Sequence, residues 1–277
     1  MKLFNIVVNG EIHLAVDSPQ GLRDLSSTGF SCDMDSLVRG HGIEELRALS
    51  AEGQLPIIKD PVYANVLAHP GKLICVGLNY RSHAEGIKMQ TMEQPVLFSK
   101  FSDALAPSGA QVYLPPWEDS YDYEAELVIV IGKEGWDLSL EEARDCIFGY
   151  TCGNDLSLRD AQMRSGQWLI GKTMPGFGPC GPCIVTADEL DPEAGLRIRS
   201  YVNSQLRQDG STKDMIFSCC QVISYASRYI KLEPGDLIFT GTPSGVMLEC
   251  QEKRWLKPGD VVDVEIEGIG RLSNKMI

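Results

Sequence analysis

Two glutamates separated by one residue stand at the start of an apolar segment. Glu124 and Glu126 lead into the run Leu127–Ile131, whose mostly β-branched residues are typical of a strand buried on both faces. Side chains alternate along a strand, so both carboxylates point to the same side, roughly 6.5 Å apart. Two like charges at this spacing repel each other unless a positive group lies between them. A divalent cation with oxygen ligands would meet that need; the alternative is a strand end whose two acids face solvent.

Five more polar residues of the right types occur elsewhere in the chain: Asp155, Lys172, Arg159, Gln162 and His83. Taken singly, each has a plainer explanation, such as a turn aspartate, an exposed lysine or a surface histidine. Taken together with the two glutamates, they make a set that can bind a divalent cation, hold a carboxylate, stabilise an enolate and move a proton.

Length and composition limit the possible functions. The 277 residues are 43% hydrophobic and 23% charged, which is ordinary for a globular protein. A net charge of −13 and a pI of about 4.8 argue against binding to nucleic acid or to an anionic membrane. No apolar run approaches the roughly 20 residues that span a bilayer, and the first residues lack signal-peptide anatomy. Nine cysteines without a short-spaced framework fit a reducing compartment, so we expect a cytoplasmic protein.

The first quarter of the chain predicts a small N-terminal domain, residues 1–68. Residues 4–8 and 12–16 flank Asn9-Gly10, which is a strong signal for a β-hairpin. Two short helices are expected near 34–39 and 43–50.

The remaining residues, 69–277, predict an α+β catalytic domain in which strands dominate. Strands are expected at 72–77 and 95–98, and the segment from Glu85 to Gln94 is expected to be a loop that lines the distal part of a substrate pocket. Ser139 and Glu142 form a capping box for a helix that reaches about residue 148. Ser157 is expected to cap a short helix that places Arg159 and Gln162 on one face. A strand and loop over 202–210 and a mostly apolar helix over 214–229 follow.

Two short motifs have better-known meanings that their surroundings do not support. Residues 166–173 fit the phosphate-loop pattern G-x-x-x-x-G-K-[ST], but Pro175 and the glycines around it cannot open the helix that such a loop requires. Residues 180–183 read Cys-Gly-Pro-Cys, as in dithiol oxidoreductases, but a strand rather than a helix is expected to follow. We predict a turn with two packed thiols there.

From about Leu73 onward, the chain resembles the fumarylacetoacetate hydrolase superfamily, because the following pieces occur in the same order: Val76–Tyr80 with His83, Asp122–Leu127, Gly149-Tyr150 with Asn154-Asp155, Arg159-Asp160 with Gln162, Gly171-Lys172, Leu232–Asp236, Thr240–Gly245 and Glu267–Gly270. Each piece is weak alone, and their order and density carry the resemblance.

The resemblance implies a mixed β-roll catalytic fold, a homodimer, and Mg²⁺ or Mn²⁺ in the site. By the same resemblance, Glu124, Glu126 and Asp155 would be the metal ligands, and Lys172 would touch the oxo group or enolate of a small carboxylate substrate. The substrate would also be held by Arg159, Gln162, Thr242 and Tyr80. His83 would lie on the segment that closes over the substrate and would activate water or move protons.

One position departs from the family pattern. Several hydrolases and decarboxylases of the family carry His-x-x-Glu, in which the glutamate orients the histidine. Here Gly86 stands at that position, and the nearest acid is Glu85. Residues two apart do not face each other on a helix, so Glu85 would serve only in a non-helical loop. Chemistry that needs proton transfer alone therefore stays open.

We predict a metal-dependent hydrolase, active in aromatic catabolism, that cleaves a C–C bond in an acylpyruvate-like 2-oxo or 1,3-dioxo acid. The alternatives are isomerisation or hydration of an unsaturated 2-oxo dioate, and decarboxylation or tautomerisation of oxaloacetate. A different class of explanation is an inactive or nucleotide-binding member of the family.

Overall fold

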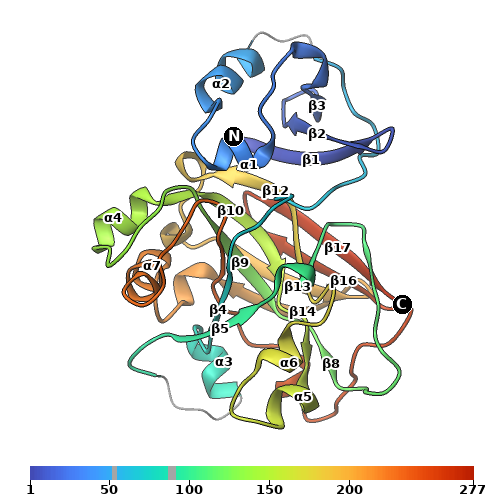
Figure 1. The fold of residues 1–277 in the computed structure, drawn as a ribbon. Coiled ribbons are helices and arrows are strands. Elements are labelled where there is room, and N and C mark those ends of the chain that lie inside the picture. Colours follow the sequence, from blue (N-terminus) through green and yellow to red (C-terminus); the bar gives the residue numbers. More distant parts are fainter. Residues whose placement is uncertain (52–54, 87–91) are drawn as a thin grey trace.

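Three β-sheets form the framework of the computed structural model, which describes residues 1–51, 55–86 and 92–277 (Figure 1). The fold is mixed α+β with strands in the majority, as predicted. The largest sheet has the order β3-β2-β1-β12-β10-β9-β15-β4-β5, with β6 beside β12. Its strands are β1 Lys2–Val8, β2 Glu11–Val16, β3 Arg23–Asp24, β4 Leu73–Gly77, β5 Val96–Lys100, β6 Leu105–Ala106, β9 Ala125–Ile131, β10 Ile147–Asn154, β12 Gly178–Thr186 and β15 Leu237–Phe239.

A second sheet has the order β14-β13-β16-β17-β7, and a two-stranded ribbon pairs β11 with β8. Their strands are β7 Gln111–Val112, β8 Tyr121–Asp122, β11 Ser157–Leu158, β13 Arg197–Val202, β14 Gln205–Ser211, β16 Val261–Ile266 and β17 Gly270–Met276. The helices are α1 Met34–Val38, α2 Ile43–Ala51, α3 Arg81–Gly86, α4 Leu140–Asp145, α5 Arg159–Met163, α6 Leu169–Lys172 and α7 Cys219–Ser227. Over the residues that the structure describes, no helix has the length and apolar character needed to cross a bilayer.

Strand β9 is the centre of the core, and all seven of its residues are buried. It pairs with β10 on one edge and with β15 on the other. Leu127 and Ile129 belong to the apolar cluster that also contains residues of the second sheet, whereas Val128 and Val130 belong to a different cluster. The strand is therefore buried on both faces, as its β-branched run predicted, and its first residues are held firmly at the end of the sheet.

The expected loop before Gly210 is a strand, β14, which pairs with β13 in a hairpin. Its turn residues Asn203 and Ser204 both have positive φ, at 51° and 66°. Two such residues make a tight hairpin turn, and Ser204 is not a residue from which this geometry is normally predicted.

Three predicted helix boundaries were wrong. Helix α4 has the predicted capping box, but it ends at Asp145, because the chain enters β10 two residues later. Ser157 lies in β11 and donates a hydrogen bond to the carbonyl of Asp155, while Leu158 precedes α5. Helix α7 begins only at Cys219, after a 3-10 helix over Thr212–Asp214.

The N-terminal hairpin is joined to the rest of the molecule through a strand pairing. Asn9 and Gly10 both have positive φ, as the predicted turn requires. Strand β1 pairs antiparallel with β12, with Leu3 opposite Ile184, so the hairpin extends the largest sheet. The division into domains 1–68 and 69–277 stays a prediction.

The Cys-Gly-Pro-Cys motif lies inside strand β12, so the predicted turn was wrong. Its cysteines are three residues apart, so their side chains leave opposite faces of the sheet. Cys180 packs in one apolar cluster and Cys183 in the other. Two thiols separated by the sheet cannot form the dithiol of an oxidoreductase.

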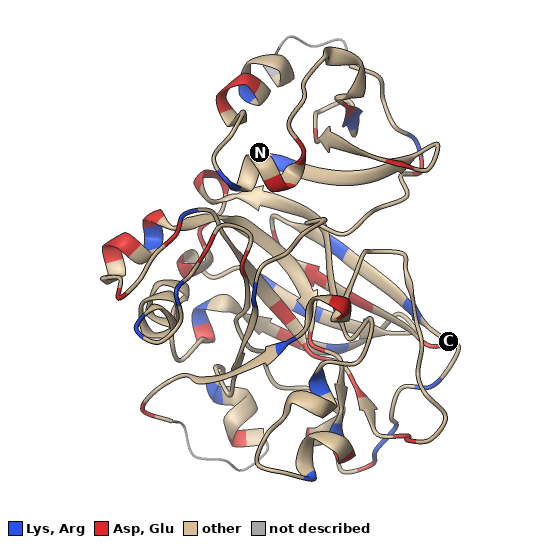
Figure 2. Cartoon of the chain, in the orientation of Figure 1, with Lys and Arg blue, Asp and Glu red and all other residues tan. Residues whose placement is uncertain are grey.

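The phosphate-loop pattern also lacks its structure. Gly171 and Lys172 end the four-residue helix α6 rather than open a helix. Of the expected loop from Glu85 to Gln94, Glu85 and Gly86 belong instead to helix α3, and residues 87–91 lie outside the described residues. Charged residues lie on the peripheral helices and loops, and acidic and basic positions also lie on central strands, where the site described below is found (Figure 2).

The tight pairing of β10 with β12 generates a stability prediction. A Cβ atom on Gly149 would lie 2.3 Å from the carbonyl oxygen of Val185. We expect Gly149→Ala to lower the free energy of unfolding by about 1–3 kcal/mol. Gly166→Ala is the control, because a Cβ atom there meets nothing within 4 Å; it should stay within about 0.5 kcal/mol of wild type. Urea unfolding measures both, and equal effects would contradict the analysis.

Candidate active site

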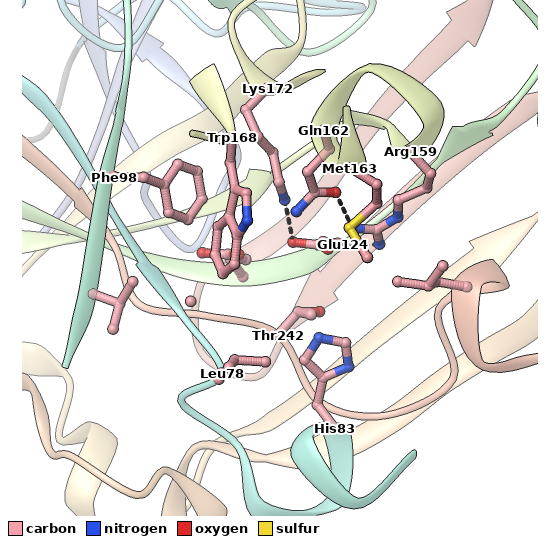
Figure 3. A pocket seen from close by; sticks show the side chains of 14 residues that line it. Leu78, His83, Phe98, Glu124, Arg159, Gln162, Met163, Trp168, Lys172 and Thr242 are labelled. Carbon is pink, nitrogen blue, oxygen red and sulfur yellow. Dashed lines mark hydrogen bonds and ion pairs between the residues drawn. The ribbon is translucent and has the colours of Figure 1, made fainter. Parts of the chain in front are cut away.

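A cavity of about 60 Å³ opens where β4, β9 and the helices α3, α5 and α6 meet, at the end of the molecule away from the N-terminal hairpin (Figure 1). This size suits a small molecule rather than a macromolecule. In Figure 3, Lys172, Gln162 and Arg159 reach in from one side and His83 from the other, with Trp168 and Phe98 forming a further wall. The lining residues are Val76, Gly77, Leu78, His83, Phe98, Glu124, Glu126, Arg159, Gln162, Met163, Trp168, Lys172, Thr242 and Leu248.

Three buried carboxylates meet at the polar end of this cavity. Glu124, Glu126 and Asp155 each offer an oxygen, and these oxygens lie within 4.8 Å of one another. Strand pairing brings them together: Asn154 at the end of β10 lies opposite Ala125. The backbone N–H of Asp155 then donates to the carbonyl of Glu124 at 2.9 Å.

Two buried lysines neutralise part of this acidic group. Lys172 Nζ lies 2.9 Å from Glu124 Oε2 and 2.7 Å from Asp155 Oδ2. Lys100 Nζ lies 2.6 Å from Asp155 Oδ1 and donates to the carbonyl of Phe177 at 2.8 Å. Burial alone would raise the pKa of Glu124, but the charges of Lys172 and then Arg159 outweigh it and hold that pKa well below its usual value. Burial would likewise lower the pKa of Lys172, and the charges of Asp155 and Glu124 raise it instead.

Glu126 is left without a cation among the described contacts. Its Oε2 accepts a hydrogen bond from the backbone N–H of Gly241 at 2.8 Å. Burial, followed by the negative charges of Asp155 and Glu124, raises its pKa well above the usual value. Three clustered carboxylates, of which one is unmatched by positive charge, fit a hard divalent cation with oxygen ligands. The acidic triad of this site is therefore able to bind a metal ion.

Arg159 is largely engaged by the protein itself. Its Nε donates to Asp122 at 2.8 Å, and its Nη2 lies 2.6 Å from Glu124 Oε1. Its Nη1 donates to Gln162 Oε1 at 3.0 Å. Arg159 therefore mainly contacts protein groups, and its contact with a substrate carboxylate stays a prediction. The amide nitrogen of Gln162 is instead oriented toward the cavity, because its oxygen faces Arg159 (Figure 3).

Thr242 lines the cavity, but its hydroxyl is also committed. It donates to the carbonyl of Ala125 and accepts from Gln208 Nε2, at 2.8 and 2.7 Å. The fully buried Gln208 accepts from the backbone N–H of Ala125 at 2.9 Å as well. These contacts fix the start of β9 against the Thr242 segment. Gln208 was missed because it sits in a segment predicted to be a loop.

His83 lies on α3 and pairs through Nδ1 with Glu249 Oε1 at 2.5 Å. Glu85, which could have been its partner only in a non-helical loop, is exposed and lies on helix α3, two residues from His83. A Cβ atom on Gly86 would lie 2.7 Å from Glu249 Cδ. Gly86, which stands where several family members carry the glutamate of His-x-x-Glu, therefore leaves room for the carboxylate of Glu249.

The structure brings most of the predicted residues together and leaves two outside. Tyr80 is fully buried and does not line the cavity, and Glu85 faces away from it. Glu249 was missed because it is 166 residues from His83 and no local spacing links them. Lys100 was missed because a lysine that ends a strand is usually exposed.

Comparison with known proteins agrees with this geometry. The family profile described as fumarylacetoacetate (FAA) hydrolase C-terminal matches residues 72–277. A fumarylacetoacetate hydrolase domain-containing protein 2 homolog from Dictyostelium discoideum is 44% identical over 219 residues, covering 75% of this chain and 72% of that protein. The mitochondrial oxaloacetate tautomerase Fahd2a of Rattus norvegicus is 38% identical over 234 residues, covering 83% and 74%.

A solved structure extends the likeness to the fold. The maleylpyruvate hydrolase of Sphingobium sp. SYK-6, in complex with manganese(II) ion and pyruvate, is 28% identical, with a TM-score of 0.81 over 100% of this chain and 99% of that one. Profile, relatives and fold agree with one another, and the chain is an enzyme that belongs to the fumarylacetoacetate hydrolase superfamily.

Proposed function

We propose that this enzyme interconverts the enol and keto forms of oxaloacetate. The observation that carries the proposal is the small cavity with the acidic triad and Lys172 at one end and the paired His83 facing them. Several relatives that are 37–38% identical carry the name oxaloacetate tautomerase. We expected acylpyruvate hydrolysis first from the sequence, and the relatives move tautomerisation ahead of it.

Glu124, Glu126 and Asp155 would hold the cation, Mg²⁺ or Mn²⁺. When bound, such an ion supplies Lewis acidity that favours the enolate form of a 2-oxo acid. Lys172 has three N–H donors, and two of them face Glu124 and Asp155. The third is left to donate to an enolate oxygen, so fixed positive charge meets the place where negative charge develops.

Gln162 and Arg159 favour a second carboxylate on the substrate. The amide nitrogen of Gln162 faces the cavity, and Arg159 lines the cavity next to Gln162, to whose Oε1 its Nη1 donates. The opposite wall is apolar, with Trp168 in edge-to-face contact with Phe98 at 5.4 Å between ring centroids. These features fit a substrate that has a 2-oxo acid group and one further carboxylate close to it, and oxaloacetate is such a molecule.

His83 would carry the proton. In the enol-to-keto direction, C3 gains a proton and the enol oxygen releases one to solvent, so the composition is unchanged. Because Nδ1 of His83 pairs with Glu249, Nε2 is the nitrogen that can exchange a proton with C3. The glutamate carboxylate stabilises the imidazolium and keeps the ring oriented.

A second candidate is the hydrolytic cleavage of an acylpyruvate. The His83–Glu249 pair favours it, because a histidine backed by a carboxylate can activate water. Oxaloacetate decarboxylation, and isomerisation or hydration of an unsaturated 2-oxo dioate, stay predictions. So do the homodimer, the cytoplasmic location and the part in aromatic catabolism.

The metal site predicts a metal-dependent stability. Millimolar Mn²⁺ or Mg²⁺ should raise the melting temperature of the wild type, because a ligand that binds only the folded state stabilises it by about 2.7 kcal/mol at 100 times its Kd. Glu126→Gln should abolish the shift. Asp263→Asn is the control, since it changes a buried acid of the second sheet that pairs with Arg271. An unchanged metal-induced shift in Glu126→Gln would contradict the assignment.

Tautomerase activity can be followed directly by the ultraviolet absorbance of enol-oxaloacetate. We expect wild-type enzyme with Mn²⁺ to accelerate its loss, and His83→Asn to reduce kcat by about 10²–10⁴-fold, the usual range for a general acid–base. EDTA should abolish the acceleration. If acylpyruvates turn over and oxaloacetate does not, the second candidate is correct.

The contact between Gly86 and Glu249 generates a rescue experiment. Glu249→Gln should lower kcat by about 10–100-fold, since it weakens the group that orients His83. A glutamate introduced at residue 86 should restore part of that activity, but only once the side chain of residue 249 is shortened, because the two compete for the same space. We therefore expect Gly86→Glu to be harmful alone and beneficial in combination with Glu249→Ala. If Gly86→Glu lowers kcat both in the wild type and in Glu249→Ala, the side chains of residues 86 and 249 do not compete for the same space.

A further inference from the structure

Asp122 touches two parts of the site without lining the cavity. It is fully buried and precedes the first metal-ligand candidate by two residues. Its Oδ2 accepts from Arg159 Nε and lies beside Nη2, both at 2.8 Å. Its Oδ1 accepts from the backbone N–H of Met247 at 2.8 Å, and its Oδ2 from that of Leu248 at 2.9 Å.

The two backbone contacts lead to His83. Met247 and Leu248 open the 3-10 helix Met247–Glu249, so Asp122 holds the start of the helix whose last residue is the partner of His83. The other oxygen of Glu249, Oε2, accepts from the backbone N–H of Gly245 at 2.6 Å. The carboxylate that faces the histidine is therefore held directly by Gly245, and its helix is held by Asp122.

The contact with Arg159 links Asp122 to Gln162, which faces the part of the cavity where a substrate carboxylate would bind. Held by Asp122 at Nε, Arg159 uses Nη1 to orient the Gln162 amide and Nη2 to reach Glu124. The side-chain amide of Gln162 would otherwise be free to turn over, and its oxygen would then face a bound carboxylate.

We propose that Asp122 is a positioning residue that sets both the amide donor of Gln162, through Arg159, and the carboxylate partner of His83, through the helix Met247–Glu249. This inference rests on the proposed function, because it assigns a substrate-side and a proton-side role to those two groups. A single ionised carboxylate has about four acceptor sites. The carboxylate of Asp122 accepts hydrogen bonds from the guanidinium of Arg159 and from the backbone N–H groups of Met247, Leu248 and Tyr123.

Asp122→Asn tests the proposal, because an amide keeps the shape but replaces one acceptor oxygen with donors. The N–H donors of the amide would then face other donors, either those of Arg159 or the backbone N–H groups of the helix Met247–Glu249. Residue 122 would therefore lose its hydrogen bond to one of these two partners. We expect kcat on enol-oxaloacetate to fall about 10–100-fold and KM to rise at least about threefold. The variant should still be stabilised by Mn²⁺, which shows that it folds and that the acidic triad remains.

Asp236→Asn is a matched control. Asp236 is equally buried, accepts from the backbone N–H groups of Lys72 and Glu233 at 2.7 and 2.8 Å, and pairs with Lys72 Nζ at 2.8 Å, but it lies outside the cavity. It should lower stability and leave kcat and KM within about twofold of wild type.

A double-mutant cycle with Glu249→Gln separates positioning from general damage. If Asp122 acts through Glu249, the loss in kcat of the double variant should fall short of the product of the single losses by at least about threefold. Asp236→Asn combined with Glu249→Gln should give the product. A multiplicative loss for Asp122→Asn, or kinetics equal to those of Asp236→Asn, overturns the proposal.

Two further measurements cover the remaining outcomes. If Asp122→Asn does not fold, Asp122→Glu keeps the charge with a longer side chain and should show the same non-multiplicative loss. If wild-type enzyme does not act on oxaloacetate, the proposed function fails; the arm through Arg159 is then decided by calorimetric binding of malate, which carries the second carboxylate, in the presence of Mn²⁺. A loss of affinity of at least about threefold in Asp122→Asn supports that arm, and unchanged affinity overturns it.

Discussion

The site depends on the balance of buried charge at the end of β9. Asp122, Glu124, Glu126 and Asp155 are met by only three cations among the described contacts, Lys100, Lys172 and Arg159. Buried ions are costly unless they are paired and hydrogen-bonded, so each of these groups constrains the position of the others. The incomplete balance at Glu126 is what gives the cluster its capacity for a further positive charge.

The surrounding strands keep these charged groups in place. The carboxylates leave from the ends of β8, β9 and β10, and β9 is buried on both faces by two separate apolar clusters. A strand fixed in this way cannot slip by one residue without moving Glu124 and Glu126 to the wrong face. The apolar run that announces the strand therefore also fixes the geometry of the acids that precede it.

The sequence was most informative where chemistry and periodicity coincide. The alternation of Glu124 and Glu126 before a β-branched run was sufficient to predict their shared face, and Asn9-Gly10 was sufficient to predict the hairpin. Sequence reasoning was weaker where a contact joins distant segments. The partner of His83 comes from a 3-10 helix near the C-terminus, and the role of Arg159 depends on an aspartate in a different strand. Residue type alone assigned Arg159 to the substrate, whereas in the structure it contacts mostly protein carboxylates.

The N-terminal hairpin has a consequence for how the enzyme can be shortened. Strand β1 covers the outer edge of β12 along the backbone of residues 184 and 185. A chain trimmed to the region shared with the family, from residue 72, would keep every residue of the cavity but would uncover that edge. An uncovered edge with buried-type residues such as Ile184 invites pairing with other chains. We therefore expect the hairpin to reduce aggregation, and an enzyme shortened in this way would need another segment to cover the edge of β12.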